Sequence, residues 1–439
     1  MRLERMVKDG GKYALLIDGA RQVGKTFIVR EFAKTHYEDY IEINFLKMKG
    51  ASAIFENVQD EKDILTKLST FVSHEFRRGK TLVFLDEVQK CPEAVTYIKF
   101  LVEEGSCHYV LSGSLLGVEL KNVRSYPVGY MDEVKMYPLD FEEFVDANGE
   151  SPVLLEAARQ AWENRKPLDS VYHTRLKKLF RLYLVVGGMP AVVQKYLDTH
   201  DISQVVAEQR KILALYRTDI TQYDEKNALR IRAVFDRIPA ELNDKNKRFF
   251  ASSLRPGMRF ENLGDEFLWL KEAGVALSVV NVEEPKRPLK LAEKPSLFKL
   301  FSNDVGLLAA QYMKGIQLRI LNGEADINFG SVYENAVAQE LAAHGFELNY
   351  YDSNRHGELD FVLEQESGLL PIEVKSGKHY RRHRALNRVL EEPESAVREA
   401  LILNDDSLKV DGRFFYAPVY MIMFLCANPL PEKMIYTID

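Results

Sequence analysis

The sequence predicts an α/β protein of several domains, and three observations support this prediction. A chain of 439 residues is longer than a single hydrophobic core usually serves. The segment YALLIDGARQVGKTFIVREFA (13–33) joins an apolar, strand-like run to a glycine-containing loop and a segment with helical spacing. The segment KTLVFLDEVQKCPEA (80–94) holds a second apolar run that ends in adjacent carboxylates, as buried parallel strands do at their C-terminal edge.

Composition limits the classes of partner. The chain has 59 lysines and arginines against 65 aspartates and glutamates, with a net charge of -6, so any contact with nucleic acid must use a local patch. The three cysteines are far apart, which argues against a zinc site or a disulfide framework and fits a cytoplasmic protein. No apolar run reaches membrane-spanning length, so we expect no membrane partner, and VYMIMFLCA (419–427) is expected to be a buried strand.

The loop after the first apolar run carries the strongest motif. Residues 19–26, GARQVGKT, fit G-x-x-x-x-G-K-[ST], in which backbone N–H groups wrap phosphates, the lysine reaches the outer phosphates and the threonine hydroxyl reaches Mg²⁺. The N-terminus of the following helix favours the same anion. The predicted cofactors are therefore ATP and Mg²⁺. The predicted contacts in this loop are Gly19, Ala20, Arg21, Gln22, Val23, Gly24, Lys25, Thr26 and Phe27.

Two carboxylates complete this prediction. Asp86 is expected to hold Mg²⁺ opposite Thr26, and Glu87 to polarise the attacking water. A small-molecule kinase transfers phosphate to a substrate hydroxyl and needs no residue that polarises water. The pair Asp86 and Glu87 therefore favours hydrolysis, with Lys25 and Glu87 as catalytic residues. A small-molecule kinase remains the alternative.

A third apolar run, CHYVLSGSLLGVEL (107–120), ends in short hydroxyl side chains. Ser112 and Ser114 could sense the γ-phosphate from a neighbouring strand end, and the alternative is an ordinary serine helix cap. Arg124 is the first arginine after this run, and it is either a stabiliser of transition-state charge or a solvated side chain.

With these motifs, the chain resembles bacterial and archaeal ATPases of the AAA+/STAND-like kind that carry a C-terminal domain of uncharacterised function. The matching phrases are GARQVGKT, LDEVQKCPEA, LSGS, SYPVGYMDEVKMYPLDFEEF, VGGMPAVV, YRTDI and KLFSNDVGLL. The resemblance implies a P-loop NTPase parallel-sheet core (1–150), a helical lid (151–225), a winged-helix region (226–295) and a restriction-endonuclease-like α/β domain (296–439). Many such ATPases complete their site with a neighbour's arginine, which is compatible with a homo-oligomer.

The segments between the motifs fit this division. Prolines and an Asn-Gly pair punctuate 138–152, and residues 153–224 have the pattern of successive amphipathic helices. Residues 226–280 indicate two helices and a strand, which suits a winged helix whose usual partner is DNA. The alternative for this region is a module that braces other domains.

A second set of charged residues lies in the last third of the chain. GELDFVL (357–363) and LLPIEVK (369–375) are expected to form adjacent antiparallel strands, with Glu373 and Lys375 on one face and Asp360 opposite them. Such a set could hold Mg²⁺ and orient a water against a phosphodiester, and it matches the D…E-x-K core of PD-(D/E)XK nucleases. The resemblance adds Glu334 as a metal ligand, although Ser331 and Glu334 also fit a helix capping box.

An arginine run follows this motif. Arg381, Arg382, Arg384 and Arg388 could contact a nucleic-acid backbone or could form a solvated helix face. The sequence thus predicts Mg²⁺-dependent ATP binding and hydrolysis coupled to a nuclease-like domain that acts on nucleic acid. The alternative is a STAND-like signalling ATPase whose C-terminal domain is a catalytically inactive binding module.

Overall fold

The chain forms two compact units. The computed structural model describes residues 2–70, 79–114, 127–223, 227–244, 247–254, 264–312, 315–324, 329–377, 381–392 and 397–427. The first unit consists of residues 1–137 and 268–275, and the second of residues 138–267 and 276–439. The division into four domains at residues 150, 225 and 295 stays a prediction.

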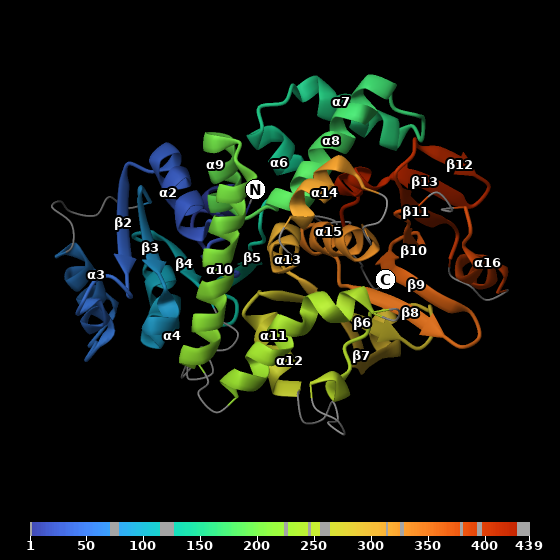
Figure 1. Cartoon of the computed structure of the whole chain (residues 1–439). Helices are drawn as coiled ribbons and strands as arrows, with labels where there is room; N and C mark the ends of the chain where they lie inside the picture. Colours follow the sequence, from blue (N-terminus) through green and yellow to red (C-terminus); the bar gives the residue numbers. More distant parts are fainter. Residues whose placement is uncertain are drawn as a thin grey trace, which may run out of the picture. The chain divides into compact units, whose positions relative to one another are not determined.

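A five-stranded parallel sheet is the centre of the first unit (Figure 1). Its order is β2-β3-β4-β1-β5, and every neighbouring pair is parallel, as the two apolar runs predicted. Because β4 lies between β1 and β3, the carboxyl ends of these three strands meet at one edge. The strands are β1 (Ala14–Asp18), β2 (Asp39–Asn44), β3 (Thr81–Asp86), β4 (His108–Gly113) and β5 (Met131–Lys135).

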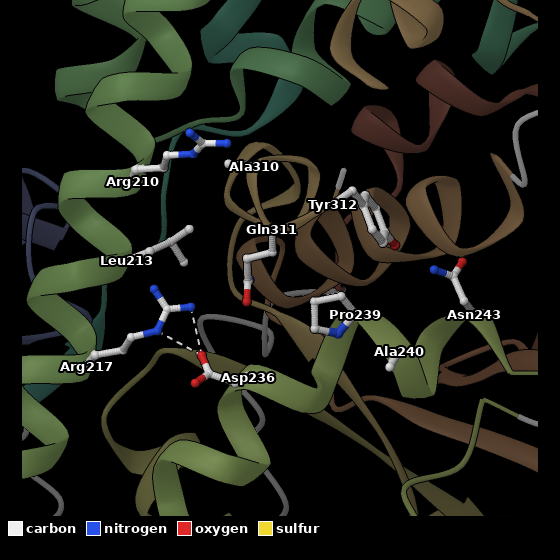
Figure 2. A pocket seen from close by; sticks show the side chains of 10 residues that line it. All are labelled: Arg210, Leu213, Arg217, Asp236, Pro239, Ala240, Asn243, Ala310, Gln311 and Tyr312. Atoms are coloured by element: carbon white, nitrogen blue, oxygen red, sulfur yellow. Dashed lines mark hydrogen bonds and ion pairs between the residues drawn. The ribbon is translucent and has the colours of Figure 1, made fainter. Parts of the chain in front are cut away.

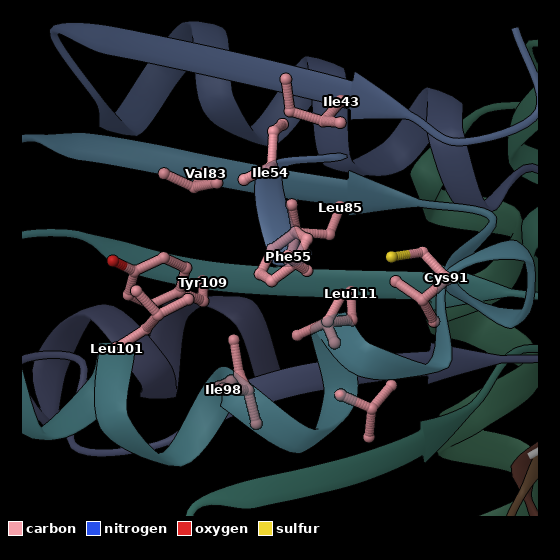
Figure 3. Packing of buried hydrophobic residues seen from close by; sticks show 14 of the residues in the cluster. Ile43, Ile54, Phe55, Val83, Leu85, Cys91, Ile98, Leu101, Tyr109 and Leu111 are labelled. Atoms are coloured by element: carbon pink, nitrogen blue, oxygen red, sulfur yellow. The ribbon is translucent and has the colours of Figure 1, made fainter. Parts of the chain in front are cut away.

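Alternate residues of these strands fill two cores, one on each face of the sheet. Leu16 and Val83 belong to one buried cluster, whereas their neighbours Leu15 and Leu82 belong to the other. Figure 3 shows the first cluster, where strand residues pack against Ile98 and Leu101 of a helix. This two-sided burial explains the continuous apolar runs in the sequence. In the described part of residues 2–137, the α-helices are α1 (Arg2–Lys8), α2 (Lys25–His36), α3 (Glu61–Ser69) and α4 (Pro92–Glu104).

The second unit begins with helices and ends with a sheet. Residues 153–223 are mostly helical, as their spacing predicted. Helix α12 (Gly264–Glu272) contains the position at which the chain passes from the second unit into the first. The other described α-helices of the second unit are α6 (Phe141–Ala147), α7 (Pro152–Glu163), α8 (Ser170–Val186), α9 (Pro190–Thr199), α10 (Ile202–Tyr223), α11 (Ala228–Asn243), α13 (Val305–Gln311), α14 (Ile316–Asn322), α15 (Phe329–Ala343) and α16 (Arg384–Glu391).

Eight strands of this unit form one mixed sheet in the order β12-β13-β11-β10-β9-β8-β6-β7. Strand β6, from the predicted winged-helix region, pairs in parallel with β8, so this region shares a sheet with the C-terminal residues. The winged helix and the nuclease-like fold stay predictions. The strands are β6 (Ala276–Val282), β7 (Glu293–Ser302), β8 (Asn349–Ser353), β9 (Gly357–Gln365), β10 (Gly368–Val374), β11 (Ala400–Asn404), β12 (Lys409–Asp411) and β13 (Phe414–Pro418).

One predicted element is wrong. The apolar run at 419–427 was expected to be a strand, but Val419–Phe424 form a buried 3-10 helix. Strand β13 ends at Pro418, and a short apolar run cannot by itself distinguish a buried strand from a buried helix. No helix among the described residues is long and apolar enough to cross a membrane.

Candidate nucleotide-binding site

The loop between β1 and α2 contains positive φ angles, which most residue types rarely adopt. Gly19 has φ of 151°, and a Cβ atom there would lie 2.3 Å from the carbonyl oxygen of Met136. Gly24 and Gln22 also have positive φ, of 100° and 70°. Positive φ is uncommon for a residue such as Gln22, and strained backbone of this kind gathers at ligand sites.

Lys25 is buried at the start of α2. Its Nζ donates to the carbonyl oxygens of Gly19 (2.7 Å) and Ala20 (2.9 Å). Burial lowers the pKa of Lys25 to about 8, against the opposing effect of Glu87 and two aspartates. The residue before the helix, Gly24, has no side chain to cap the first N–H groups. A phosphate fits this arrangement, because it would accept hydrogen bonds from the lysine and from the helix start.

Three hydrogen bonds fix the carboxylate of Asp86. Thr26 Oγ1 donates to Asp86 Oδ2 at 3.1 Å, and Asn44 Nδ2 donates to the same oxygen at 2.7 Å. Ser112 Oγ donates to Oδ1. The two predicted metal ligands, Thr26 and Asp86, are therefore in direct contact. Oxygen ligands at the edge of a phosphate loop fit Mg²⁺, which keeps several waters of its own.

Glu87 lies next to this carboxylate in a second hydrogen-bonded group. Gln89 Nε2 donates to Glu87 Oε2 at 2.5 Å, and Ser114 Oγ lies 3.5 Å from the same oxygen. Arg21 Nε donates to Ser114 Oγ at 3.3 Å, so this group connects Glu87 to the phosphate loop. Glu87 itself has φ of 59°, which is uncommon outside glycine and the asparagine class.

The remaining residues predicted for this site lie as follows. Ala20 and Val23 are buried in the loop, and Phe27 is 70% exposed on α2. Ser112 contacts Asp86, and Ser114 contacts Arg21 and Glu87, while residues 115–126, which the helix-cap alternative concerns, lie outside the described residues. Arg124 lies outside the described residues. The roles of all these residues in nucleotide binding stay predictions.

The sequence analysis missed three polar residues of this site. Asn44 and Gln89 hold the carboxylates of Asp86 and Glu87. Asp18 is 6% exposed, burial raises its pKa, and its Oδ1 has no hydrogen-bond partner among the described residues. The only available signal was that Asp18 and Asn44 each end an apolar, strand-like run.

The second unit brings the predicted C-terminal residues into one region. Strands β9 and β10 pair antiparallel, as expected, with Phe361 opposite Ile372. Lys375 Nζ lies 2.7 Å from Glu373 Oε2, and Asp360 Oδ2 accepts the backbone N–H of Val374 at 2.8 Å. Burial raises the pKa of Glu373 to about 7, with Lys375 lowering it and Asp360 raising it.

Two further lysines, missed from the sequence, neutralise the carboxylates around this region. Lys247 forms an ion pair with Glu334, and the fully buried Lys299 lies 2.5 Å from Glu358 Oε1. Burial raises the pKa of Glu334 to about 7, with Asp360 raising it further and Lys247 opposing. No group of three or more His, Cys, Asp or Glu side chains among the described residues could hold a metal ion.

In this arrangement Lys247 pairs with Glu334, and Lys375 pairs with Glu373. The metal-ligand roles of Glu334, Asp360 and Glu373, and the catalytic roles of Asp360, Glu373 and Lys375, stay predictions. The arginine run begins before α16 and continues on it. Arg381, Arg382, Arg384 and Arg388 are all exposed, while Leu386 and Val389 on the same helix are buried.

The fold and the loop geometry define the first unit as a P-loop ATPase domain. Residues 11–145 match the family described as AAA domain. Two families described as Domain of unknown function, DUF8612 and DUF4143, match residues 177–318 and 329–421. No curated protein matches the chain.

Three solved archaeal structures are distantly similar to the chain. The Walker-type ATPase of Pyrococcus abyssi is 14% identical, covering 71% of this chain and 94% of that one, with a TM-score of 0.41. The Orc1 protein of Aeropyrum pernix, in complex with DNA, is 12% identical, covering 73% and 92%, with a TM-score of 0.26. Cdc6p from Pyrobaculum aerophilum is 12% identical, covering 73% and 91%, with a TM-score of 0.23.

Proposed function

We propose that the first unit binds ATP with Mg²⁺ and hydrolyses its terminal phosphate bond. The observation that carries this proposal is the contact between Thr26 and Asp86, with the ammonium of Lys25 in the same loop. A threonine hydroxyl, a strand-end carboxylate and a buried lysine are the groups that a phosphate chain with Mg²⁺ needs.

Each residue has a separate task in this proposal. Lys25 exchanges its bonds to two loop carbonyls for bonds to phosphate oxygens. Thr26 and Asp86 would hold hydrated Mg²⁺, which neutralises the charge that develops on the phosphates. Glu87, held by Gln89, accepts a hydrogen bond from the attacking water and orients it. Ser114 and Arg21 connect this carboxylate to the loop that holds the phosphates.

Release of inorganic phosphate from ATP tests this assignment. Wild-type protein with Mg²⁺ is expected to release phosphate, and Lys25→Ala to lose both binding and release. Glu87→Gln is expected to bind ATP with similar affinity and to turn over about a hundredfold more slowly or worse, because it removes only the base. Glu93→Gln, an exposed charge change at the start of α4, is the matched control. Phosphate release that is equal in wild type and Lys25→Ala would refute the proposal.

We further propose that the nucleotide state of the first unit regulates the second unit as a binding module for nucleic acid. The ion pairs of Glu334 with Lys247 and of Glu373 with Lys375 favour this candidate, because each carboxylate already has a cationic partner. Nuclease activity is the other candidate, and it is supported by the placement of Asp360 on β9, Glu373 on the neighbouring β10 and Lys375 directly after β10. Either candidate is compatible with a homo-oligomer.

A further inference from the structure

A pocket in the second unit is lined by residues other than those of the phosphate loop and of the D…E-x-K pattern. It has a volume of about 760 Å³, is open to solvent and lies between three helices, α10, α11 and α13 (Figure 2). Volumes of about 300–1,000 Å³ are typical of small-molecule sites. Its lining is mixed, with the apolar side chains of Leu213, Pro239 and Ala310 among polar and charged ones.

One end of the pocket is cationic. Arg210 and Arg217, seven residues apart, both extend from α10 (Figure 2). Arg217 pairs with Asp236 at 2.7 Å, but Asp236 also lies 3.5 Å from Arg232 and is thus shared between two arginines. No carboxylate in the described part of the chain pairs with Arg210. An anionic group would therefore gain charge-assisted hydrogen bonds here.

The opposite end offers an aromatic ring and an amide. Asn243 and Tyr312 lie on the side away from the arginines, with Gln311 between the two ends (Figure 2). Ser331 Oγ donates to Asn243 Oδ1 at 2.9 Å, and the side chain of Asn243 also forms a hydrogen bond with Tyr312. The half-buried tyrosine ring suits the flat face of a heterocycle.

We propose that this pocket binds a small phosphorylated heterocycle of the nucleotide class, as an effector site separate from the phosphate loop. Its phosphates lie against Arg210 and Arg217, and its ring lies against Tyr312. The combination of a cationic end and an aromatic end distinguishes this ligand from inorganic phosphate alone. A nucleic-acid duplex fits less well, because its bases are stacked within the duplex and are not available to the ring of Tyr312.

Binding of the fluorescent probe mant-ADP to full-length Lys25→Ala protein tests the proposal independently of the phosphate loop. This protein is expected to retain saturable binding, and inorganic pyrophosphate is expected to compete with the probe. Adding Arg210→Ala and Arg217→Ala is expected to weaken binding at least about tenfold, since it removes both cationic partners of the phosphates. Adding Tyr312→Leu is expected to weaken probe binding and to leave pyrophosphate binding unchanged.

Lys211→Ala is the matched control, because it removes one positive charge from α10 at an exposed residue that does not line the pocket. The far-UV circular dichroism spectrum of Arg210→Ala/Arg217→Ala, compared with that of the wild type, reports whether the double variant folds. The proposal is overturned if Lys25→Ala protein binds no probe, or if the double variant binds it as tightly as the Lys211→Ala protein does. It is also overturned if a 20-base-pair DNA duplex, and not pyrophosphate, displaces the probe.

Discussion

At the scale of single residues, Asn44 connects a strand end to the carboxylate that would hold the metal. Its Nδ2 donates to Asp86, while its Oδ1 accepts the backbone N–H groups of Leu46 and Lys47. The amide therefore needs both a donor and an acceptor, which only asparagine supplies at this length. Residues that orient a ligand carboxylate affect metal affinity strongly without touching the metal.

We expect Asn44→Ala to raise the Mg²⁺ concentration needed for half-maximal phosphate release by about 10–100-fold. The KM for ATP at saturating Mg²⁺ should change much less, because Lys25 and the loop are intact. At low Mg²⁺, Asn44→Asp should release phosphate even more slowly than Asn44→Ala, since it removes the donor and places a second negative charge beside Asp86. A Mg²⁺ titration of the initial rate gives the answer, and an unchanged titration for both variants would contradict this role.

The sequence predicts those residues whose relation is local. Lys25 and Thr26 are fixed by spacing within one loop, and Asp86 by its place at the end of an apolar run. Asn44 and Gln89 could not be predicted in the same way. Asn44 meets Asp86 because β2 and β3 pair with these two residues opposite each other, and strand register depends on the whole sheet.

At the scale of elements, α15 is held in the second unit by a buried polar network. Glu340 Oε1 accepts the backbone N–H of Phe141 at 2.8 Å and the hydroxyl of Tyr183 at 3.1 Å. Just after the helix, the ring of His344 contacts Leu425 O at 2.8 Å and Asp140 Oδ2 at 3.4 Å. The helix is thereby tied to the start of α6 and to the segment after Phe424.

This network predicts a pH dependence of stability. Burial alone lowers the pKa of His344, but contacts with Asp140, Cys426 and Glu340 outweigh it and raise this pKa to about 11. The folded state thus holds a proton that the unfolded state releases near its ordinary pKa of about 6.5. Stability from this proton is complete below pH 6.5 and is lost as the pH rises toward 11. Burial raises the pKa of Glu340 to about 8, so this residue adds a further loss of stability as the pH rises from its ordinary pKa to pH 8.

We expect the free energy of unfolding of the wild type to fall between pH 6.5 and 9.5. In His344→Gln this fall should be smaller by about 3–4 kcal/mol, because the variant has no proton to lose at this site and each pH unit between the two pKa values contributes about 1.4 kcal/mol. Urea unfolding followed by circular dichroism at several pH values measures both slopes. His200→Gln, an exposed histidine change in the same unit, is the control. Parallel slopes for wild type and His344→Gln would show that the ring is not charged in the folded protein.

Elements with a strong local pattern were predicted well, and their pairing across long distances was not. The β1, β3 and β4 runs and the β9–β10 hairpin follow from apolar runs and a short turn. The partnership of β6 with β8 joins residues about seventy positions apart and leaves no local signal. The same applies to Lys247 and Lys299, whose carboxylate partners are far away in the sequence.

At the scale of the whole molecule, the open question is whether the second unit cuts nucleic acid or binds it. In the described residues, Glu373 of the D…E-x-K pattern pairs with Lys375, the nearby Glu334 pairs with Lys247, and the arginines at and before α16 are exposed. We therefore expect a fluorescent oligonucleotide to bind in a salt-dependent manner and to remain intact with Mg²⁺ or Mn²⁺. Arg382→Ala/Arg384→Ala should weaken binding about tenfold at low salt, whereas Lys409→Ala, an exposed lysine on β12, should not.

The nucleotide state supplies the decisive comparison. If the first unit regulates binding, the affinity for the oligonucleotide should differ severalfold between ATP and ADP in wild type, and Lys25→Ala should abolish the difference. Gel electrophoresis of the same samples detects cleavage. Metal-dependent cleavage that disappears in Glu373→Ala/Lys375→Ala would show that the second unit is a nuclease and not only a binding module. A metal ion would then have to displace the lysines from their carboxylate partners. Equal affinity with ATP and ADP would instead show that the nucleotide in the first unit does not regulate binding by the second. A ligand shifts an equilibrium only by its differential affinity for the two states.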